Sequence, residues 1–469
     1  MSDSPNAADI ISTDPDRDGG PRPGACEQLE QTPGDRPARD SYDAVIVGGS
    51  LAGCATAIML ARGGARVALL EQRPDPSAYK KICSHYIQSS AVATLERLGL
   101  LEPMIGAGAV RSRVRLRTPW GWIEPPSEPL VPSGVNLRRE VLDPLIRETA
   151  AQTDGVDVFL GHTVHELLRE GDVVCGALAR DSAGAELRLR SKLLVGADGR
   201  GSRVAKLSGV KAKTVPHGRI AYGGYFEGPP PAGSPDASFW LLDPDMAAAF
   251  PTDTGLTFYA VMPVKERAGE FRDDPAKALV EMLRSVPDPP PIAASRMIQP
   301  AQGKLDMTNV ANTPTAPGLA LVGDAALAID PLWGVGCGWA LQSAEWLADS
   351  VSASLAGSEP LGDGLKRYRR RHARALRGHA AMIYDYAGGR KFNAPERLLF
   401  SAATYDEGMS AVMEAFGTRN IGPGRMMLSG MPRALLARTR RGLSRRADGR
   451  SHSLPVSSTA GGSSSRGAR

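Results

Sequence analysis

Apolar residues near the start of the expected folded part predict a strand, a helix and a second strand. Residues 42–47 read YDAVIV, a short apolar run followed by two glycines, and residues 66–71 read RVALLE. The alanine-rich residues 51–62 lie between these two runs. Short apolar runs next to glycine are typical of buried strands. The order therefore predicts a βαβ unit, which requires a parallel sheet.

Residues 205–310 follow a different pattern. Pro-rich turns separate short runs that contain aromatic residues, at 220–226, 238–242 and 256–262, and residues 274–285 have helical character. Short runs bounded by turns are typical of antiparallel strands. We expect these residues to form a second, mostly antiparallel domain inserted into the first.

The first pattern then returns, with an expected strand at 319–322 and expected helices at 343–355 and 361–386. The predicted fold class is α/β, a Rossmann-type domain with a parallel sheet and helices that carries an inserted, mostly antiparallel β substrate domain. The two ends of the chain, rich in Pro, Gly, Ser and charged residues, predict disorder. The expected limits are 1–40 disordered, 41–205 and 311–390 first domain, 206–310 substrate domain, 391–446 helical, and 447–469 a disordered basic tail.

The net charge of +5 is concentrated at the C-terminal end of the chain. Residues 432–469 contain nine Arg and one Asp, which leaves the rest of the chain slightly acidic. A basic tail of this kind does not predict a nucleic-acid-binding fold. Two interpretations of residues 431–450 stay open. They form either a solvated flexible tail or a basic amphipathic segment that associates weakly with an anionic membrane surface.

Several classes of protein are disfavoured by what the sequence lacks. No apolar run reaches the roughly 18 residues of a membrane-spanning helix, and the first residues lack the pattern of a secretory signal. The five cysteines form no CxxC pair and no metal-ligand spacing, which predicts a reducing cytoplasm and no bound metal. A serine hydrolase is disfavoured because no G-x-S-x-G turn lies between a strand and a helix.

The first motif with chemical content is GGSLAG, Gly48–Gly53, which is followed by Glu71. In a dinucleotide site Gly48 permits a tight turn, Gly53 lets the helix pack against the strand, and the helix N-terminus attracts phosphate. Ser50 takes a position at which such sites commonly have glycine. A carboxylate at Glu71, where the second strand ends, can accept hydrogen bonds from ribose hydroxyls. The arrangement predicts nucleotide binding.

Three further segments place polar residues or glycines at expected strand or helix ends. Arg139 opens a helix in NLRREVLDPLI, and Asp198 follows a strand in LLVGADGRGSRV. In LVGDAALAIDPLWGVGCGWALQS, Asp324 follows a strand and three glycines precede a helix. These glycines are Gly334, Gly336 and Gly338. The last segment suits a polyol held by the carboxylate and an electron-rich ring edge held by backbone N–H groups.

The order and spacing of these four motifs resemble the p-hydroxybenzoate-hydroxylase-like flavoprotein superfamily over residues 42–385. This superfamily includes aromatic hydroxylases and epoxidases, geranylgeranyl reductases and flavin-dependent halogenases. The resemblance implies FAD as the cofactor and NAD(P)H as its reductant. The positions that it assigns to the ADP half of FAD are Gly48, Ser50, Gly53 and Glu71, with Arg139 near the pyrophosphate. It further implies that Asp198 braces FAD where NAD(P)H docks, that Asp324 binds the ribityl chain, and that Gly336 and Gly338 direct N–H groups at the flavin.

Three local features bear on the branch of the superfamily. Lys81 and Cys83 resemble the K-x-C-G segment of the geranylgeranyl reductases, with a Ser in place of the Gly. Phe258 and Ala260 stand where halogenases carry the tryptophans of W-x-W-x-I-P, which disfavours a halogenase. Leu327 replaces the His of the GDAAH segment found in many aromatic hydroxylases.

The resemblance therefore implies an FAD-dependent monooxygenase that transfers oxygen from O2 to an apolar small-molecule metabolite, for example in secondary metabolism. A C=C bond reductase stays open as the alternative, and a non-catalytic protein that has kept the fold is the third hypothesis. Cys83 and His85 are candidate catalytic groups, although a small buried cysteine and a loop histidine would look the same. The substrate should lie between the two domains. The expected walls of its cavity are Tyr222, Tyr225, Phe239, Trp240 and Phe258.

Overall fold

The computed structural model describes residues 41–451, with the surroundings of side chains to residue 441. The expected disorder of residues 1–40 and 452–469 lies outside the described residues. Helix α11 (Pro423–Ser451) continues past residue 446, so the first residues of the expected disordered tail are helical instead. Within the described residues, no helix is both long enough and apolar enough to cross a membrane.

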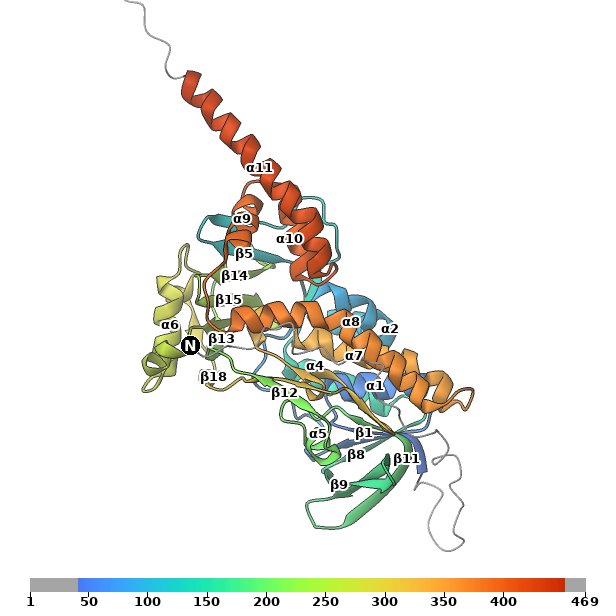
Figure 1. Ribbon diagram of the computed structural model, residues 1–469. Coiled ribbons are helices and arrows are strands. Elements are labelled where there is room, and N and C mark those ends of the chain that lie inside the picture. The colour runs from blue at the N-terminus through green and yellow to red at the C-terminus, as the bar shows by residue number, and fades with distance from the viewer. Residues whose placement is uncertain (1–40, 452–469) are drawn as a thin grey trace, which may run out of the picture.

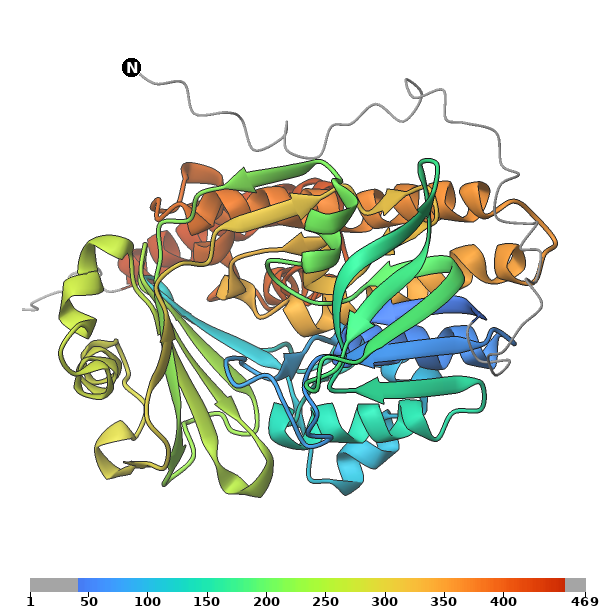
Figure 2. The same cartoon turned by 90° about the horizontal axis from the view of Figure 1, so that it is seen from below.

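The first layer is an eight-stranded sheet that contains the predicted βαβ unit (Figures 1 and 2). Its central strand, β1 (Ser41–Val47), runs parallel to β2 (Val67–Glu71) on one side and to β11 (Glu186–Gly196) on the other. Ala44 and Ile46 contribute to one apolar core and Val45 and Val47 to another, so the strand is apolar from Ala44 onward, as expected for a parallel strand buried on both faces. The other strands are β8 (Val156–Leu160), β9 (Thr163–Glu170), β10 (Val173–Arg180), β20 (Thr315–Ala316) and β21 (Leu319–Leu321).

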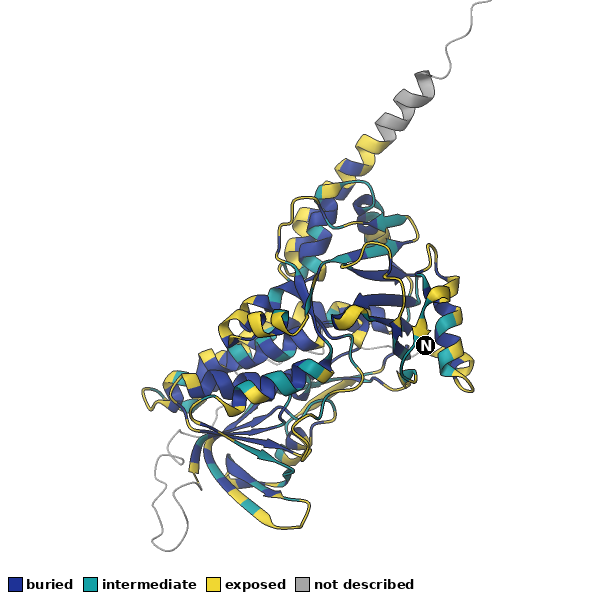
Figure 3. Ribbon diagram, turned by 180° about the vertical axis from the view of Figure 1, so that it is seen from behind, coloured by how far each residue is buried: buried dark blue, intermediate teal, exposed yellow. Residues whose placement is uncertain are grey.

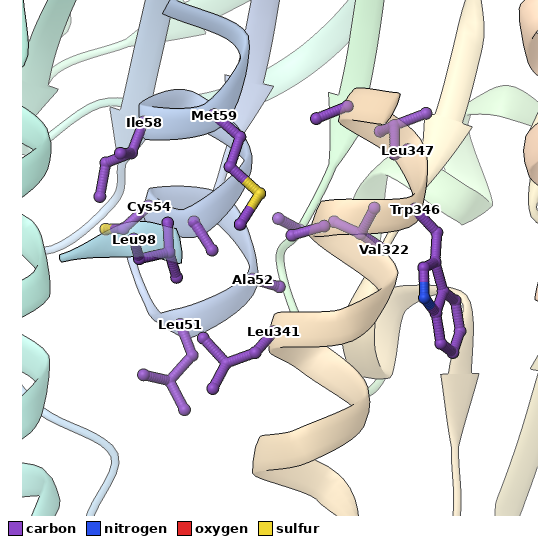
Figure 4. Packing of buried hydrophobic residues seen from close by; sticks show 14 of the residues in the cluster. Leu51, Ala52, Cys54, Ile58, Met59, Leu98, Val322, Leu341, Trp346 and Leu347 are labelled. Carbon is purple, nitrogen blue, oxygen red and sulfur yellow. The ribbon is translucent and has the colours of Figure 1, made fainter. Parts of the chain in front are cut away.

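Four helices pack on one face of this sheet, and strands β9 and β10, which continue the sheet from β11, fold over its other face. The helices are α1 (Leu51–Arg62), α4 (Arg139–Ala151), α7 (Gly336–Leu355) and α8 (Leu361–Ala387). Figure 4 shows the contact between α1 and α7, where Leu51 and Ala52 approach Leu341. Helix α1 is buried along almost its whole length, whereas Figure 3 shows exposed residues on the outer side of α8. Burial of this apolar face holds the two distant parts of the first domain together.

The second layer is another eight-stranded sheet, with α6 (Pro275–Ser285) packed on one face. Its strands β13 (Ala221–Glu227), β14 (Ala237–Leu241) and β16 (Thr257–Met262) match the three expected aromatic runs. Strand β15 (Met246–Pro251) lies between β14 and β16 and was not expected. The α/β prediction with an inserted, mostly antiparallel sheet is confirmed.

Part of the second sheet comes from an earlier segment than expected. Strands β5 (Val114–Thr118) and β6 (Gly121–Ile123) extend its edge, and β5 runs parallel to β14. Both strands lie outside the 206–310 limits of the expected substrate domain. The remaining sheet strands are β3 (Tyr86–Ile87), β4 (Val110–Ser112), β7 (Gly134–Asn136), β12 (Ala212–Val215), β17 (Arg296–Met297), β18 (Gln302–Lys304), β19 (Asn309–Asn312) and β22 (Leu327–Ala328).

Three helices follow the first domain at the C-terminal end. Helices α9 (Ala394–Ala403), α10 (Glu407–Gly417) and α11 pack together, and α9 also meets β6. Figure 1 shows α11 projecting away from the body of the molecule. The remaining α-helices are α2 (Val92–Leu98), α3 (Leu101–Gly106) and α5 (Arg203–Ser208).

Candidate active site

A cleft of about 910 Å³ lies at the carboxyl ends of the parallel strands. Ligands of doubly wound sheets bind at this end, because the loops that follow the strands leave a crevice there. All four sequence motifs contribute to its lining. The predicted site residues that line it are Gly48, Ser50, Glu71, Cys83, Arg139, Asp198, Asp324 and Gly336.

The glycine turn at one end of the cleft has no room for side chains. Gly48 has φ of +113°, and a Cβ on it would lie 2.5 Å from the carbonyl oxygen of Ala197. A Cβ on Gly53 would lie 1.8 Å from the carbonyl oxygen of Gly48, because α1 packs directly against the turn. The Glu71 carboxylate accepts hydrogen bonds from the backbone N–H groups of Gly49 at 2.8 Å and Arg73 at 3.0 Å. Glu71 therefore braces the turn and still has acceptor capacity that faces the cleft.

Arg139, the first residue of α4, connects this turn to the middle of the cleft. Its Nη2 atom donates to Ser50 Oγ at 2.7 Å and to Asp143 Oδ1 at 2.6 Å. Arg139 and Asp143 are both almost fully buried, so each charge depends on the other for compensation. The ion pair fixes the guanidinium beside the turn, where the resemblance places the pyrophosphate.

The two aspartates of the later motifs have different surroundings. Asp198 accepts hydrogen bonds from Ser202 Oγ at 2.5 Å and from the N–H group of Arg203 at 2.7 Å, so it closes the turn that begins α5. Asp324 Oδ2 accepts a hydrogen bond from Lys80 Nζ at 3.2 Å. Burial acts to raise the pKa of Asp324, but the positive charges of Lys80, Arg200 and Arg139 and the hydrogen bond from Lys80 together outweigh it, so the pKa lies below its usual value. Asp324 is therefore an anion in the middle of the cleft.

The three glycines around the start of α7 face two directions. Gly334 and Gly336 line the cleft. Gly338 faces away from it, where a Cβ would lie 3.1 Å from Nη2 of Arg419. Because the first N–H groups of a helix have no partner within the helix, the start of α7 offers donors to this end of the cleft. Gly336 is the residue placed to contribute, whereas the position of Gly338 suits close packing.

A smaller pocket of about 90 Å³ adjoins the cleft and lies against the second sheet. It shares Cys83 and Pro331 with the cleft. Four of the five expected cavity walls line it, whereas Trp240 lies on the opposite face of the sheet and packs against Trp122. The aromatic and sulfur-containing lining comprises Tyr222, Tyr225, Phe239, Phe250, Phe258, Met262 and Cys83.

His85 and Tyr225 form a buried pair beside this pocket. The backbone N–H of Arg139 donates to His85 Nδ1 at 3.0 Å, and His85 Nε2 is hydrogen-bonded to the Tyr225 hydroxyl. Burial lowers the pKa of His85 to about 4, so the ring is neutral at pH 7. Since Nδ1 accepts, the ring proton lies on Nε2 and is donated to the Tyr225 oxygen. The Tyr225 O–H is then left to donate elsewhere, and Tyr225 lines the pocket.

Sequence reasoning missed Lys80, Arg200 and Cys337, which also line the cleft. Arg200 is held in place by donating to the carbonyl oxygen of Thr308 at 2.7 Å. Cys337 lies between two glycines of the fourth motif, and that place was a usable signal. Arg200 lies in the third motif, two residues after Asp198, and that place was a usable signal as well, whereas the position of Lys80 depends on the path of an irregular loop.

The comparisons with known proteins agree with this geometry. Residues 41–380 match the family described as FAD binding domain. The chain belongs to this family. It is therefore an FAD-dependent oxidoreductase, and enzymes of this kind use NAD(P)H as the reductant of FAD. The resemblance to the p-hydroxybenzoate-hydroxylase-like superfamily is confirmed.

Its relatives catalyse more than one kind of reaction. Digeranylgeranylglycerophospholipid reductase 1 of Methanococcoides burtonii is 25% identical over 340 residues, which cover 71% of this chain and 80% of the relative. Aklavinone 12-hydroxylase DnrF of Streptomyces peucetius is 27% identical over 346 residues, 68% of this chain and 69% of the relative. The fold is shared with the flavin-dependent brominase Bmp2, which has a TM-score of 0.68 at 19% identity and covers 87% of this chain and 100% of its own.

The residues that line the cleft fit FAD. Its volume of about 910 Å³ lies at the upper end of the range for ligand sites. The turn at Gly48 and Gly53 keeps the backbone free of side chains where a phosphate would approach. The basic side chains of Lys80, Arg139 and Arg200 line the same cleft and suit a diphosphate and an electron-rich ring.

Proposed function

We propose that the protein is an NAD(P)H-dependent monooxygenase that transfers oxygen from O2 to a small, largely apolar, ring-containing metabolite. The observation that supports this proposal is the aromatic pocket that adjoins the cleft beside Cys83 and Pro331. Apolar walls with few fixed polar groups orient a ring and exclude water from the reacting atoms. FAD, when bound in the cleft, supplies the redox chemistry.

We assign the proposed contacts with FAD to residues that line or shape the cleft. Gly48, Ser50, Gly53 and Glu71 hold the ADP half, either directly or by shaping the turn, and Arg139 lies near the pyrophosphate. Asp198 fixes the loop that follows β11. Asp324 binds the ribityl chain, Gly336 provides a backbone donor to the flavin, and Gly338 allows α7 to pack closely.

The proposed substrate carries an oxygen atom that accepts a hydrogen bond. His85 is neutral and donates from Nε2 to Tyr225, so Tyr225 is oriented to donate its own proton into the pocket. His85 thus acts as a positioning residue rather than as the catalytic group for which the sequence made it a candidate. Phenols and quinones carry an oxygen of the required kind.

The test uses the FAD-loaded protein with NADH or NADPH, ¹⁸O₂ and a panel of phenols, naphthoquinones and anthraquinones. We expect one ¹⁸O atom in the product and one NAD(P)H oxidised for each product molecule. A product that gains two hydrogen atoms under argon, with no oxygen incorporated in air, would overturn the proposal.

A C=C bond reductase is the second candidate function. Cys83 favours it, because this residue lies where the cleft meets the apolar pocket and belongs to the segment that resembles the geranylgeranyl reductases. The discriminating measurement is the reduction of a geranylgeranyl lipid by the reduced protein under strict anaerobiosis. Oxygen-independent turnover supports the reductase, and a strict requirement for O2 eliminates it.

We also propose that α11 associates weakly with anionic membrane surfaces. Leu428, Leu435 and Leu436 on this helix are 81%, 53% and 59% exposed, and arginines surround them in the sequence. A helix with apolar and basic positions binds at the headgroup boundary. In flotation with phosphatidylglycerol vesicles, the full chain should float and a truncation at Met431 should not. Equal flotation of an L435S/L436S variant would contradict the proposal.

A further inference from the structure

Two thiols from distant parts of the chain meet at the junction of the cleft and the apolar pocket. Cys83 lies in the loop between β2 and β3, and Cys337 is the second residue of α7. Their Sγ atoms are 3.6 Å apart, and both residues line the cleft. The proposed oxygenation gives this pair no role. Cys54 and Cys175 are buried elsewhere in the fold.

The surroundings of the pair make the two thiols unequal. Arg139 Nη1 lies 3.7 Å from Cys83 Sγ and 3.9 Å from Cys337 Sγ, and the backbone N–H of His85 donates to Cys83 Sγ at 3.3 Å. The hydrogen bond from Cys337, and then the charge of Arg139, hold the pKa of Cys83 well below its usual value. The same hydrogen bond, together with burial, raises the pKa of Cys337. Cys83 therefore loses its proton more readily than Cys337 does, so the anionic form of the pair is favoured at Cys83.

We propose that Cys83 and Cys337 form a reversible disulfide when the cleft meets hydrogen peroxide. The Cys83 thiolate attacks one peroxide oxygen, the O–O bond breaks, and the departing hydroxide takes a proton to become water. Cys83 is then a sulfenic acid. The sulfur of Cys337 attacks the Cys83 sulfur, the S–O bond breaks, and the thiol proton leaves with the hydroxide as a second water. Counted from the Cys83 thiolate and the Cys337 thiol, the pair loses two electrons and one proton, the solvent supplies the other proton, and one peroxide gives two waters.

The source of the peroxide connects this pair of thiols to the proposed function. The statement that the enzyme itself produces the peroxide rests on the proposed monooxygenase function. O2 that takes two electrons from NAD(P)H in the cleft without transferring oxygen leaves as hydrogen peroxide. The oxidant is then produced beside the thiols whenever no substrate fills the pocket.

Disulfide formation must change the cleft. The sulfurs have to close from 3.6 Å to about 2 Å, which draws the Cys83 loop and the start of α7 together. That loop also carries Lys80, the partner of Asp324. The bond removes the thiolate beside Arg139 as well. We infer that the disulfide slows NAD(P)H oxidation and so limits wasteful use of the reductant.

The first experiment adds hydrogen peroxide directly to the full-length FAD-loaded protein. We expect the loss of two free thiols, a proteolytic peptide pair linked through Cys83 and Cys337, and recovery of both thiols with dithiothreitol. NAD(P)H oxidation should fall about tenfold on treatment and recover with the thiols. Because the peroxide is supplied, the thiol result is the same whether the enzyme oxygenates or reduces its substrate.

Single variants separate the two steps. In C337S, Cys83 should stop at the sulfenic acid, which dimedone traps. In C83S, peroxide should consume thiols about tenfold more slowly. C54A is the matched control and should react as the wild type does, because burial raises the pKa of Cys54 to about 12.

Three results would overturn the inference. They are the absence of a linked Cys83–Cys337 peptide in the wild type, a disulfide through Cys26 instead, or unchanged NAD(P)H oxidation in protein that carries the bond. All three are measured on the wild-type protein, so they decide the matter even if neither serine variant folds.

Discussion

At the scale of the residue, Gly53 sets the geometry of the nucleotide turn. A Cβ at this position would lie 1.8 Å from the carbonyl oxygen of Gly48, so α1 or the turn would have to move. We predict that G53A weakens FAD binding at least about tenfold and lowers the free energy of unfolding by roughly 2–3 kcal/mol. Fluorescence titration of the apoprotein with FAD and thermal melts measure the two effects.

The matched control for this prediction is Gly362, near the start of α8. A Cβ there would meet nothing within 4 Å, and alanine favours a helix more than glycine does. G362A should bind FAD as the wild type does and melt at the same or a slightly higher temperature. Equal loss of FAD binding in both variants would show that the close approach at Gly53 is not the cause.

The Tyr225 hydroxyl carries the second prediction at this scale. If it donates to the substrate, Y225F should raise KM about tenfold and leave the reduction of FAD by NAD(P)H unchanged in the absence of substrate. Y259F is the control, because the Tyr259 ring lies on the opposite face of the sheet, against α6. Stopped-flow reduction and steady-state kinetics test both variants. An unchanged KM in Y225F contradicts the proposed substrate contact.

At the scale of the element, the pattern of residues along the sequence predicted those helices and strands that pack against elements nearby in the sequence. β1, α1 and β2 follow from one apolar run, one glycine turn and one alanine-rich stretch. Strands β5 and β6 were not assigned to the second sheet, because their place depends on pairing with β14, more than a hundred residues later. The contact between Cys83 and Cys337 was missed for the same reason. Pairing between segments that are far apart in the chain leaves no repeating pattern of apolar and polar residues in either segment, so the sequence alone does not reveal it.

Helix α8 makes the protein sensitive to acid. Burial lowers the pKa of His372 and of His379 to about 4. In the unfolded chain a histidine binds its proton near pH 6.5, so between pH 6.5 and 4 the unfolded state holds more protons. The free energy of unfolding therefore falls as the pH falls through this window, by up to roughly 3 kcal/mol for each histidine.

We predict a steep decrease in Tm between pH 6.5 and 4, and a smaller decrease in H372L than in the wild type. Circular dichroism melts across this range measure both slopes. The comparison uses the slope with pH rather than the absolute Tm, because the substitution also changes packing. Identical slopes would show that His372 is not one of the groups that titrate on unfolding.

At the scale of the whole molecule, Asp253 ties the second sheet to the first domain. Its carboxylate, almost fully buried, accepts hydrogen bonds from Arg138 N at 3.0 Å and Arg138 Nε at 2.8 Å, just before α4. In D253N the Arg138 guanidinium keeps its more exposed partner Glu140, at 2.9 Å, but loses its buried anionic partner, and the loss of a buried partner is costly. We predict that D253N lowers the free energy of unfolding by roughly 2–3 kcal/mol.

D288N is the matched control for this interface. Asp288 pairs with Arg117 in an ion pair whose carboxylate is largely exposed, and such pairs contribute little. In urea denaturation, D253N should therefore unfold at a clearly lower urea concentration than D288N. Similar midpoints for D253N and D288N would mean that the Arg138 pair does not hold the domains together.

The strand order of the first sheet also has a consequence for synthesis on the ribosome. During synthesis, β2 follows β1 within a few tens of residues. The other neighbour of β1, strand β11, begins only at Glu186, and Asp324 is synthesised later still. At roughly 5–20 residues per second, Asp324 emerges roughly 10–50 s after Glu71. Until then a nascent chain offers only the adenosine end of the cofactor site. Cofactor capture is thus among the last events of synthesis, after most of the second sheet has emerged.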